Sequence, residues 1–263
     1  LSKRMDEQAK KSLQQVIDID PGNKPAHLQL LSFAIAKNDM DEIIRICIPA
    51  VNYMPEALEF HYYLGLAHYQ KEERDKALEV FKKGIRQITP ESDKTLASDF
   101  YAIMGDLYHL KKMNEEAYEA YDSALVYKPD NISALNNYAY YLSVEKKELD
   151  KAEEMSYRTV KAEPSNGTYL DTYAWILFEK GKYVEARIYI DQAMKHEGDK
   201  SSVVVEHCGD IYYFNGEHEQ AVEYWKQAEK LAGEPVENES EARKPEELKL
   251  LKKKITHKKY FLK

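Results

Sequence analysis

The residues of this chain that could do chemistry are scattered along the sequence. A zinc site of the His-Glu-x-x-His type needs a second histidine one helical turn on, and His218-Glu219 has none. His207 and Cys208 are adjacent, and adjacent residues point to different faces of a helix. We therefore expect Cys208 in the core and His207 on the surface, and neither pair predicts a metal centre.

The sequence patterns of common enzyme active sites do not occur either. Glycine is too rare and too scattered for a phosphate-binding loop, and no Gly-x-Ser-x-Gly nucleophile turn is found. Acidic pairs such as Glu115-Glu116 and Glu153-Glu154 fall at expected helix starts or exposed faces, where the helix dipole explains them. We therefore expect no catalytic residue, no cofactor and no metal, and a protein that is not an enzyme.

The composition narrows the class of protein. Charged residues make up 32% of the 263 residues, hydrophobic residues make up 43%, and the net charge is −8. With 10 glycines and 9 prolines, the chain has few residues for the many tight turns of a β-sandwich or barrel. No stretch approaches the roughly 18 continuous apolar residues of a membrane span. We expect a helical protein without a transmembrane segment, and its acidic body argues against nucleic acid as a partner.

Small residues recur at a fixed period. Pro21 and Pro55 lie 34 residues apart, and a 34-residue frame fits six successive copies of one pattern. Position 8 of the frame is glycine or alanine in five copies, and so are positions 20 and 27. The small residues at position 8 are Gly65, Gly105, Ala139, Ala174 and Gly209.

This spacing has a mechanical meaning. Positions 8 and 20 fall on two successive helices, and small side chains let the two helix backbones cross closely. Large side chains at position 24 would fill the space above these small residues, as knobs beside holes. The pattern therefore predicts pairs of helices that pack side by side, with position 24 occupied by Phe81, Tyr121, Ile190 and Trp225.

These recurring positions resemble those of the tetratricopeptide repeat family over residues 1–235. The resemblance implies an all-α fold, a right-handed α-solenoid of helix-turn-helix repeats with a C-terminal capping helix. The first residues read as the second helix of a truncated repeat, so we expect a piece of a longer array. The predicted parts are 1–23 (lone helix), 24–57 (divergent first repeat), 58–97 (second repeat and an insertion), 98–131, 132–166, 167–201 and 202–235 (third to sixth repeats), and 236–263 (acidic linker and basic capping helix).

The resemblance also implies a binding surface, because the first helices of such repeats line a concave groove. In this sequence the matching positions form an aromatic ribbon with interleaved carboxylates. In one interpretation the aromatic side chains pack on neighbouring helices and the acids are solvated. In the other, the ribbon binds an extended or helical peptide. The candidate groove residues are Tyr62, Leu66, Tyr69, Asp106, His109, Asn136, Tyr140, Asp171, Trp175, Phe178, Glu206, Asp210 and Tyr213.

The function implied by the resemblance is a non-catalytic scaffold that binds a peptide or protein partner in this groove. Family members that clamp an acidic C-terminal tail do so with Lys, Arg and Asn. This chain carries Asp106, Asp171 and Asp210 there, so we do not expect an acidic tail as its partner. The runs 134–140 and 169–175 resemble bacterial tetratricopeptide proteins, many of them linked to the cell envelope. This implies an envelope-related assembly, in the periplasm or at a membrane, with the cytoplasm as the alternative.

Other hypotheses stay open beside this one. The chain could form homo-oligomers through its lone N-terminal helix and its basic C-terminal helix, because an uncapped array exposes an apolar edge. It could instead be the part that localises a larger enzyme or a membrane-anchored protein. The lysine-rich residues 244–263 could contact nucleic acid or anionic lipid. We interpret them instead as the solvated face of a capping helix with the apolar stripe Leu248, Leu251 and Ile255.

Overall fold

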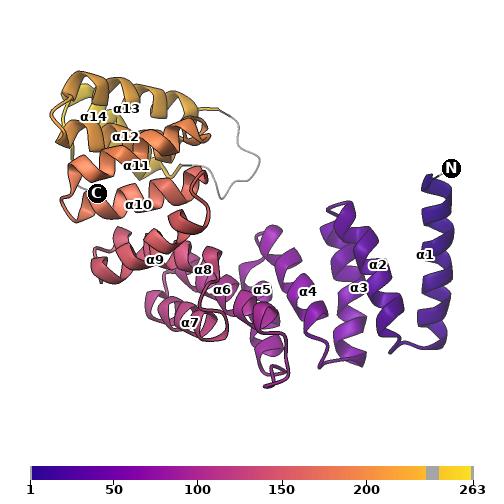
Figure 1. Ribbon diagram of the computed structural model, residues 1–263. Helices are drawn as coiled ribbons and strands as arrows, with labels where there is room; N and C mark the ends of the chain where they lie inside the picture. The colour runs from indigo at the N-terminus through magenta and orange to yellow at the C-terminus, as the bar shows by residue number, and fades with distance from the viewer. Residues whose placement is uncertain (1, 235–242, 262–263) are drawn as a thin grey trace. The chain divides into compact units, whose positions relative to one another are not determined.

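The computed structural model describes residues 2–234 and 243–261, and all regular structure within these ranges is helical (Figure 1). Contacts divide the chain into two compact units, residues 1–134 and residues 135–263, and each is described by itself. The predicted acidic linker falls on 235–242, outside the described residues. None of the described helices has the length and apolarity needed to cross a membrane. The helices are α1 (Ser2–Ile19), α2 (Lys24–Ala36), α3 (Met40–Tyr53), α4 (Leu58–Gln70), α5 (Arg74–Ile85), α6 (Lys94–Leu110), α7 (Asn114–Tyr127), α8 (Ile132–Val144), α9 (Leu149–Ala162), α10 (Gly167–Glu179), α11 (Tyr183–Lys195), η1 (Gly198–Lys200), α12 (Ser202–Phe214), α13 (His218–Ala232) and α14 (Pro245–His257).

Polar side chains define where several helices begin. The Asn23 side chain accepts a hydrogen bond from the Ala26 amide at 3.1 Å at the start of α2. Asp39 accepts one from the Glu42 amide at 3.0 Å at the start of α3. The first amides of a helix have no carbonyl partner within it, so these side chains satisfy them and fix the helix start.

Tight turns join the helices within each pair, and each turn needs a residue with positive φ. In the first unit these residues are Asn38, Glu72 and Lys112, whereas in the second unit they include Gly181 and Gly216. Only glycine adopts this left-handed conformation without a steric cost. The pair turns of the first unit therefore hold more backbone strain than these two glycine turns.

The first unit stacks the pairs α2–α3, α4–α5 and α6–α7, and in the last two pairs a glycine lets the two helices approach each other. A Cβ added to Gly65 on α4 would lie 2.7 Å from Phe81 Cζ on α5. A Cβ on Gly105 of α6 would lie 2.7 Å from Tyr121 Cε1 on α7. Both rings are fully buried. This confirms that the aromatic side chain at position 24 fills the space left by the small residue at position 8.

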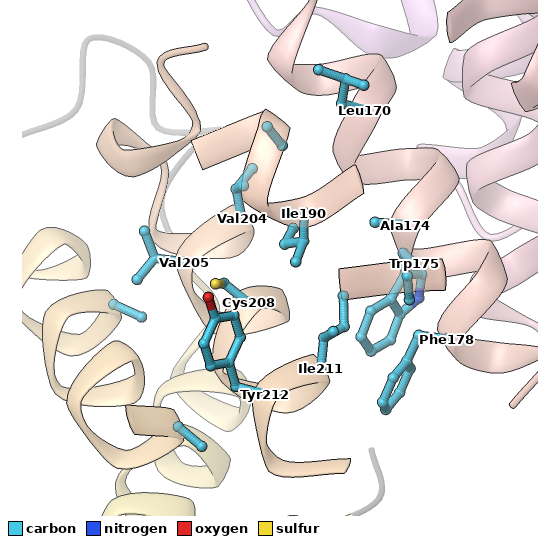
Figure 2. Close-up of a cluster of buried hydrophobic side chains, with 14 of the residues drawn as sticks. Leu170, Ala174, Trp175, Phe178, Ile190, Val204, Val205, Cys208, Ile211 and Tyr212 are labelled. Atoms are coloured by element: carbon cyan, nitrogen blue, oxygen red, sulfur yellow. The ribbon is translucent and has the colours of Figure 1, made fainter. Parts of the chain in front are cut away.

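The second unit repeats this packing around a buried core to which α10, α11, α12 and α13 contribute. Figure 2 shows side chains of this core, among them Ile190, Cys208 and Ile211, all 0% exposed. A Cβ on Gly209 would lie 2.5 Å from Trp225 Cδ1, and Trp225 is itself 0% exposed. The same glycine–aromatic pairing therefore occurs in both units.

Helix α14 packs on α13 and completes the second unit. Its Leu251 is fully buried and its Ile255 is half-buried, in line with the predicted apolar stripe. Lys252 and Lys253 are exposed, but the prediction of a solvated lysine face is wrong for Lys254, which is 0% exposed. A buried ammonium is costly unless charged partners surround it, so Lys254 points to a specific contact.

Candidate functional site

We call the predicted groove residues before residue 135 the inner face of unit 1, and those after it the inner face of unit 2. On α4, the residues Tyr62, Leu66 and Tyr69 are all half-buried. The Tyr62 ring packs against Phe81 and Phe100, with centroids 6.4 and 5.7 Å apart. Burial raises the pKa of Tyr62 to about 12 and also raises the pKa of Tyr69. Both hydroxyls therefore stay protonated at neutral pH and present donors on a partly apolar surface.

The next helix of this inner face, α6, carries Asp106 and His109, both half-buried. The Tyr121 hydroxyl of α7 donates a hydrogen bond to the Asp106 carboxylate. Tyr121 is the ring that fills the space over Gly105, so the carboxylate holds its polar end. Asp106 thus fastens the second helix of the pair to the first, a role that its sequence position did not predict.

In unit 2 the structure brings three predicted residues together around one cavity of about 700 Å³. Asn136 and Asp171 are buried and Tyr140 is half-buried, and all three line the cavity. Burial, with the Asp171 carboxylate nearby, raises the pKa of Tyr140 to about 12. The cavity is therefore lined by a neutral hydroxyl, an amide and a carboxylate.

The expectation for His207 is wrong, because this side chain is 1% exposed. Its ring nitrogen Nδ1 lies 2.9 Å from Asp171 Oδ1, and its ring stacks on Trp175 with centroids 4.1 Å apart. The adjacency to Cys208 misled the prediction, because α12 is packed by α10, α11 and α13. More than one face of the helix is buried in such a stack, so neighbouring residues can both be internal.

The aromatic residues of α10 are packed rather than open. Trp175 and Phe178 are 4% and 5% exposed, and their rings stack with centroids 4.8 Å apart. Phe178 also contacts Phe214 of α12 and Tyr260, which follows α14, at centroid distances of 5.2 and 5.9 Å. For these two residues the structure shows packing on neighbouring elements of the same unit.

Helix α12 carries the acidic end of the inner face of unit 2. Asp210 accepts a hydrogen bond from Trp225 Nε1 at 2.9 Å, the counterpart of the contact between Tyr121 and Asp106. Lys254 Nζ lies 2.6 and 2.7 Å from the two Asp210 carboxylate oxygens. Burial raises the pKa of Asp210, and the Lys254 ammonium opposes this rise. The carboxylate thus joins α12 to both α13 and α14.

The two remaining groove residues of α12 differ in environment. Glu206 is 1% exposed, and its Oε1 accepts a hydrogen bond from Lys254 Nζ at 2.7 Å. The Arg243 guanidinium, just before α14, also bonds to Glu206. Tyr213 is half-buried, with its ring 4.5 Å from that of His218. The structure therefore places two carboxylates beneath a basic segment and an aromatic ring at its margin.

Sequence reasoning missed the residues that contact this acidic end, namely Arg243, Lys254 and Tyr260. One signal was available, because Lys254 lies three residues after Leu251 and directly before Ile255. A lysine within the apolar stripe of a helix lies on the side that packs. The lysine-rich composition around it concealed this signal.

The side chains of the described residues are suited to binding a partner through contact area and hydrogen bonds. Between residues 2 and 234 and between 243 and 261, no cluster of three His, Cys, Asp or Glu side chains could hold a metal ion. Burial raises the pKa of Cys47 to about 12 and also raises the pKa of Cys208, so both are thiols at neutral pH. The arrangement supplies aromatic area, carboxylates and hydroxyl donors.

Comparison with known proteins agrees with this architecture. The tetratricopeptide repeat family matches residues 25–93 and 207–235. The TPR repeat-containing protein PA4667 of Pseudomonas aeruginosa is 24% identical over 205 residues, which cover 76% of this chain. The chain spans only 33% of the length of that relative.

Solved structures show the same fold. A tetratricopeptide repeat protein from Parabacteroides merdae aligns with a TM-score of 0.63 and 16% identity, covering 88% of this chain and 86% of that one. YrrB, described as a TPR protein with an unusual peptide-binding site, aligns with a TM-score of 0.57 and 14% identity, covering 72% and 93%. The recurring glycine–aromatic pairing, the sequence matches in both units and the fold of these neighbours identify the chain as a tetratricopeptide repeat protein.

Proposed function

We propose that this protein is a non-catalytic scaffold that binds a peptide or protein partner on its inner face. The observation that carries the proposal is the contact between α12 and the basic segment 243–261. There, two inner-face carboxylates already bind a helical segment through its lysine. A surface that selects one helix by charge and aromatic contact has the chemistry to select others.

The inner face of unit 1 supports the same function by a different chemistry. Tyr62, Leu66 and Tyr69 lie along α4 and are half-buried, so part of each side chain is accessible. Tyrosine supplies contact area at a low cost in side-chain entropy, together with a hydroxyl donor. The described peptide site of YrrB, a protein of the same fold, is consistent with a peptide as the partner.

The charge of this surface favours basic over acidic partners. Glu206 and Asp210 are compensated by Arg243 and Lys254, and a carboxylate ligand would bring charge of the wrong sign. We therefore propose that the partner is not an acidic C-terminal tail. The setting that we propose is a bacterial envelope-related assembly, supported by the resemblance of runs 134–140 and 169–175 and by the relative in Pseudomonas aeruginosa.

The test is partner capture with a matched pair of variants. Leu66→Ala and Tyr69→Ala together remove accessible inner-face area in unit 1. The control, Val184→Ala with Ile188→Ala, removes side chains on α11 that are 69% and 54% exposed. Proteins crosslinked to the full chain in cells are quantified by mass spectrometry, after circular dichroism has shown that both variants are folded. We expect the inner-face variant alone to lose partners, and equal losses from both variants would refute the proposal.

A further inference from the structure

Residues 243–261 follow α12 from its beginning to its end. At the start of α12, Arg243 Nη1 donates a hydrogen bond to Ser202 Oγ at 3.2 Å. At its end, the Tyr260 ring meets the Phe214 ring edge-on, with centroids 5.0 Å apart. The segment is thus laid along the inner face of unit 2 in one defined register.

The centre of this contact is a buried charge cluster. Lys254, at 0% exposure, is within 2.7 Å of both Glu206 and Asp210. Its ammonium also lies 5.8 Å from the centroid of the Trp225 ring and 5.1 Å from that of Tyr260. Carboxylates and aromatic faces both attract a cation, so the two carboxylates of α12 together with Trp225 of α13 can receive an ammonium group.

The apolar part of the contact centres on one fully buried side chain. Leu251 is the fully buried apolar residue of α14, while Leu248, Leu250, Ile255 and Tyr260 are half-buried. Exchanging an apolar contact for a buried ion pair adds specificity more than net stability, because desolvation offsets the attraction. The segment is therefore selected by its charge as well as by its apolar side chains.

We propose that residues 243–261 are an intramolecular ligand of the inner face of unit 2, and that the partner of this surface is a segment of the same chemistry. That partner is an amphipathic helix of another protein, with a lysine that enters between Glu206 and Asp210. The inference rests on the proposed function, because it names the partner class and the regulation of the same surface. Partner binding releases α14, which acts as a built-in competitor.

The chemistry of the site excludes other classes of segment. An acidic helix would add charge to two buried carboxylates, and an apolar helix would leave both without compensation. A helix with a lysine near an apolar residue three positions earlier matches the pattern of Leu251 and Lys254. An aromatic residue six positions after the lysine matches Tyr260, which reaches Phe178 and Phe214.

The test uses a labelled synthetic peptide of residues 243–261, titrated into the full chain and followed by fluorescence anisotropy. In the chain variant Lys254→Met, two carboxylates lose their ammonium partner, so α14 is released and the site opens. Leu251→Asp opens the site by a second route, the loss of the buried apolar contact, and leaves Lys254 and both of its carboxylate partners in the sequence. Lys252→Met, on the exposed side of the same helix, is the matched control.

We expect the peptide to bind both opened chains at least ~10-fold more tightly than the wild type or the Lys252→Met control, because the competitor is gone. A peptide carrying Lys254→Met should fail to bind any of them. Equal affinity for all four chains, or binding of the Lys254→Met peptide as tight as that of the unaltered peptide, would overturn the inference. Circular dichroism checks that each variant is folded.

Two further readings keep the outcomes distinct. A wild-type dimer in light scattering that Leu251→Asp converts to a monomer would mean that α14 is exchanged between copies, which overturns an intramolecular ligand. Partner capture through Leu66 and Tyr69 of unit 1 tests the proposed function independently. If partner capture does not depend on Leu66 and Tyr69, the peptide result is still valid. If the peptide does not bind, the capture result is still valid.

Discussion

The inner faces of the two units carry an aspartate at the same repeat position and surround it differently. In unit 1, Asp106 is half-buried and accepts a hydrogen bond from Tyr121. In unit 2, Asp210 is 0% exposed, accepts one from Trp225 and also binds Lys254. The shared role of the aspartate is to hold the aromatic residue of the second helix, and in unit 2 its charge also attracts the ammonium of α14.

In the second repeat, both residues of the corresponding pair are apolar. There the aromatic residue at position 24 is Phe81, which has no polar atom, and position 9 carries Leu66. Repeats with a tyrosine or tryptophan at position 24 carry an aspartate at position 9 instead. The residue pair thus varies together within one chain, because a buried hydroxyl or indole N–H needs an acceptor.

The largest expected effect comes from neutralising Asp210, and the same change at Asp106 is its comparison. Asp210→Asn keeps an acceptor for Trp225 but removes a charge that Lys254 needs. Breaking a buried ion pair in this way should lower the free energy of unfolding of unit 2 by about 3 kcal/mol. Asp106→Asn keeps an acceptor for Tyr121, so it should cost less than about 1 kcal/mol.

Urea unfolding can separate the two units. Trp175 and Trp225 are the two tryptophans of the chain and both lie in unit 2, so tryptophan fluorescence reports that unit. Far-ultraviolet circular dichroism reports all helices together. Similar losses for Asp210→Asn and Asp106→Asn would show that Lys254 does not depend on the charge of Asp210.

The next effect in size should be the same in both units. Gly65→Ala would bring a methyl group to 2.7 Å from Phe81, and Gly209→Ala to 2.5 Å from Trp225. Both are internal ring contacts, so each substitution should cost about 1–3 kcal/mol through overpacking. The measurement is again urea unfolding, and an unaffected Gly65→Ala would show that Phe81 shifts at little cost.

Much of the fold was available from the sequence because it depends on short-range periodicity. Gly65, Gly105 and Gly209 stand at one position of a 34-residue frame, and the structure places an aromatic ring over each. A small residue that recurs at a fixed spacing on paired helices marks the point where the two helix backbones approach closely. The helix pairs and their contacts therefore follow from the pattern alone.

The site was less accessible, because its contacts join residues that are distant in sequence. Lys254 meets Glu206 and Asp210 across a segment of the chain whose path the sequence does not specify. His207 and Asp171 lie on different repeats and pair only once the helices are stacked. Periodicity identifies the face on which a residue lies, but it does not identify the side chain that arrives from another element.

The pair turns give a smaller effect of opposite sign in the two units. Glu72 adopts a φ of 60° in unit 1, whereas Gly216 adopts 87° in unit 2, with no atom within 4 Å of the position that a Cβ would take. Glu72→Gly relieves the strain of a left-handed residue and should stabilise the chain by up to ~1 kcal/mol. Gly216→Ala should destabilise it by about 1 kcal/mol. Thermal unfolding checks both, and destabilisation by Glu72→Gly would contradict the expected strain.

The smallest effect concerns the response of unit 1 to acid. His61 Nε2 lies 2.9 Å from the Pro55 carbonyl oxygen, and burial lowers the pKa of this imidazole below its ordinary value of 6.5. Val205 occupies the matching repeat position in unit 2 and does not titrate.

Below about pH 6.5, His61 is protonated in a larger fraction of the unfolded chains than of the folded chains, because burial lowers its pKa in the folded state. The contribution of His61 to stability is therefore complete above pH 6.5 and is lost as the pH falls through the lowered folded-state pKa. His61→Gln cannot titrate, and its amide can still donate to Pro55. Thermal unfolding at about pH 7 and about pH 5 should show a smaller loss for this variant than for the wild type. An identical loss in both would assign the acid sensitivity to other groups, with carboxylates such as Glu73, whose pKa is lowered to about 2 by Lys76 and His68, as the next to test.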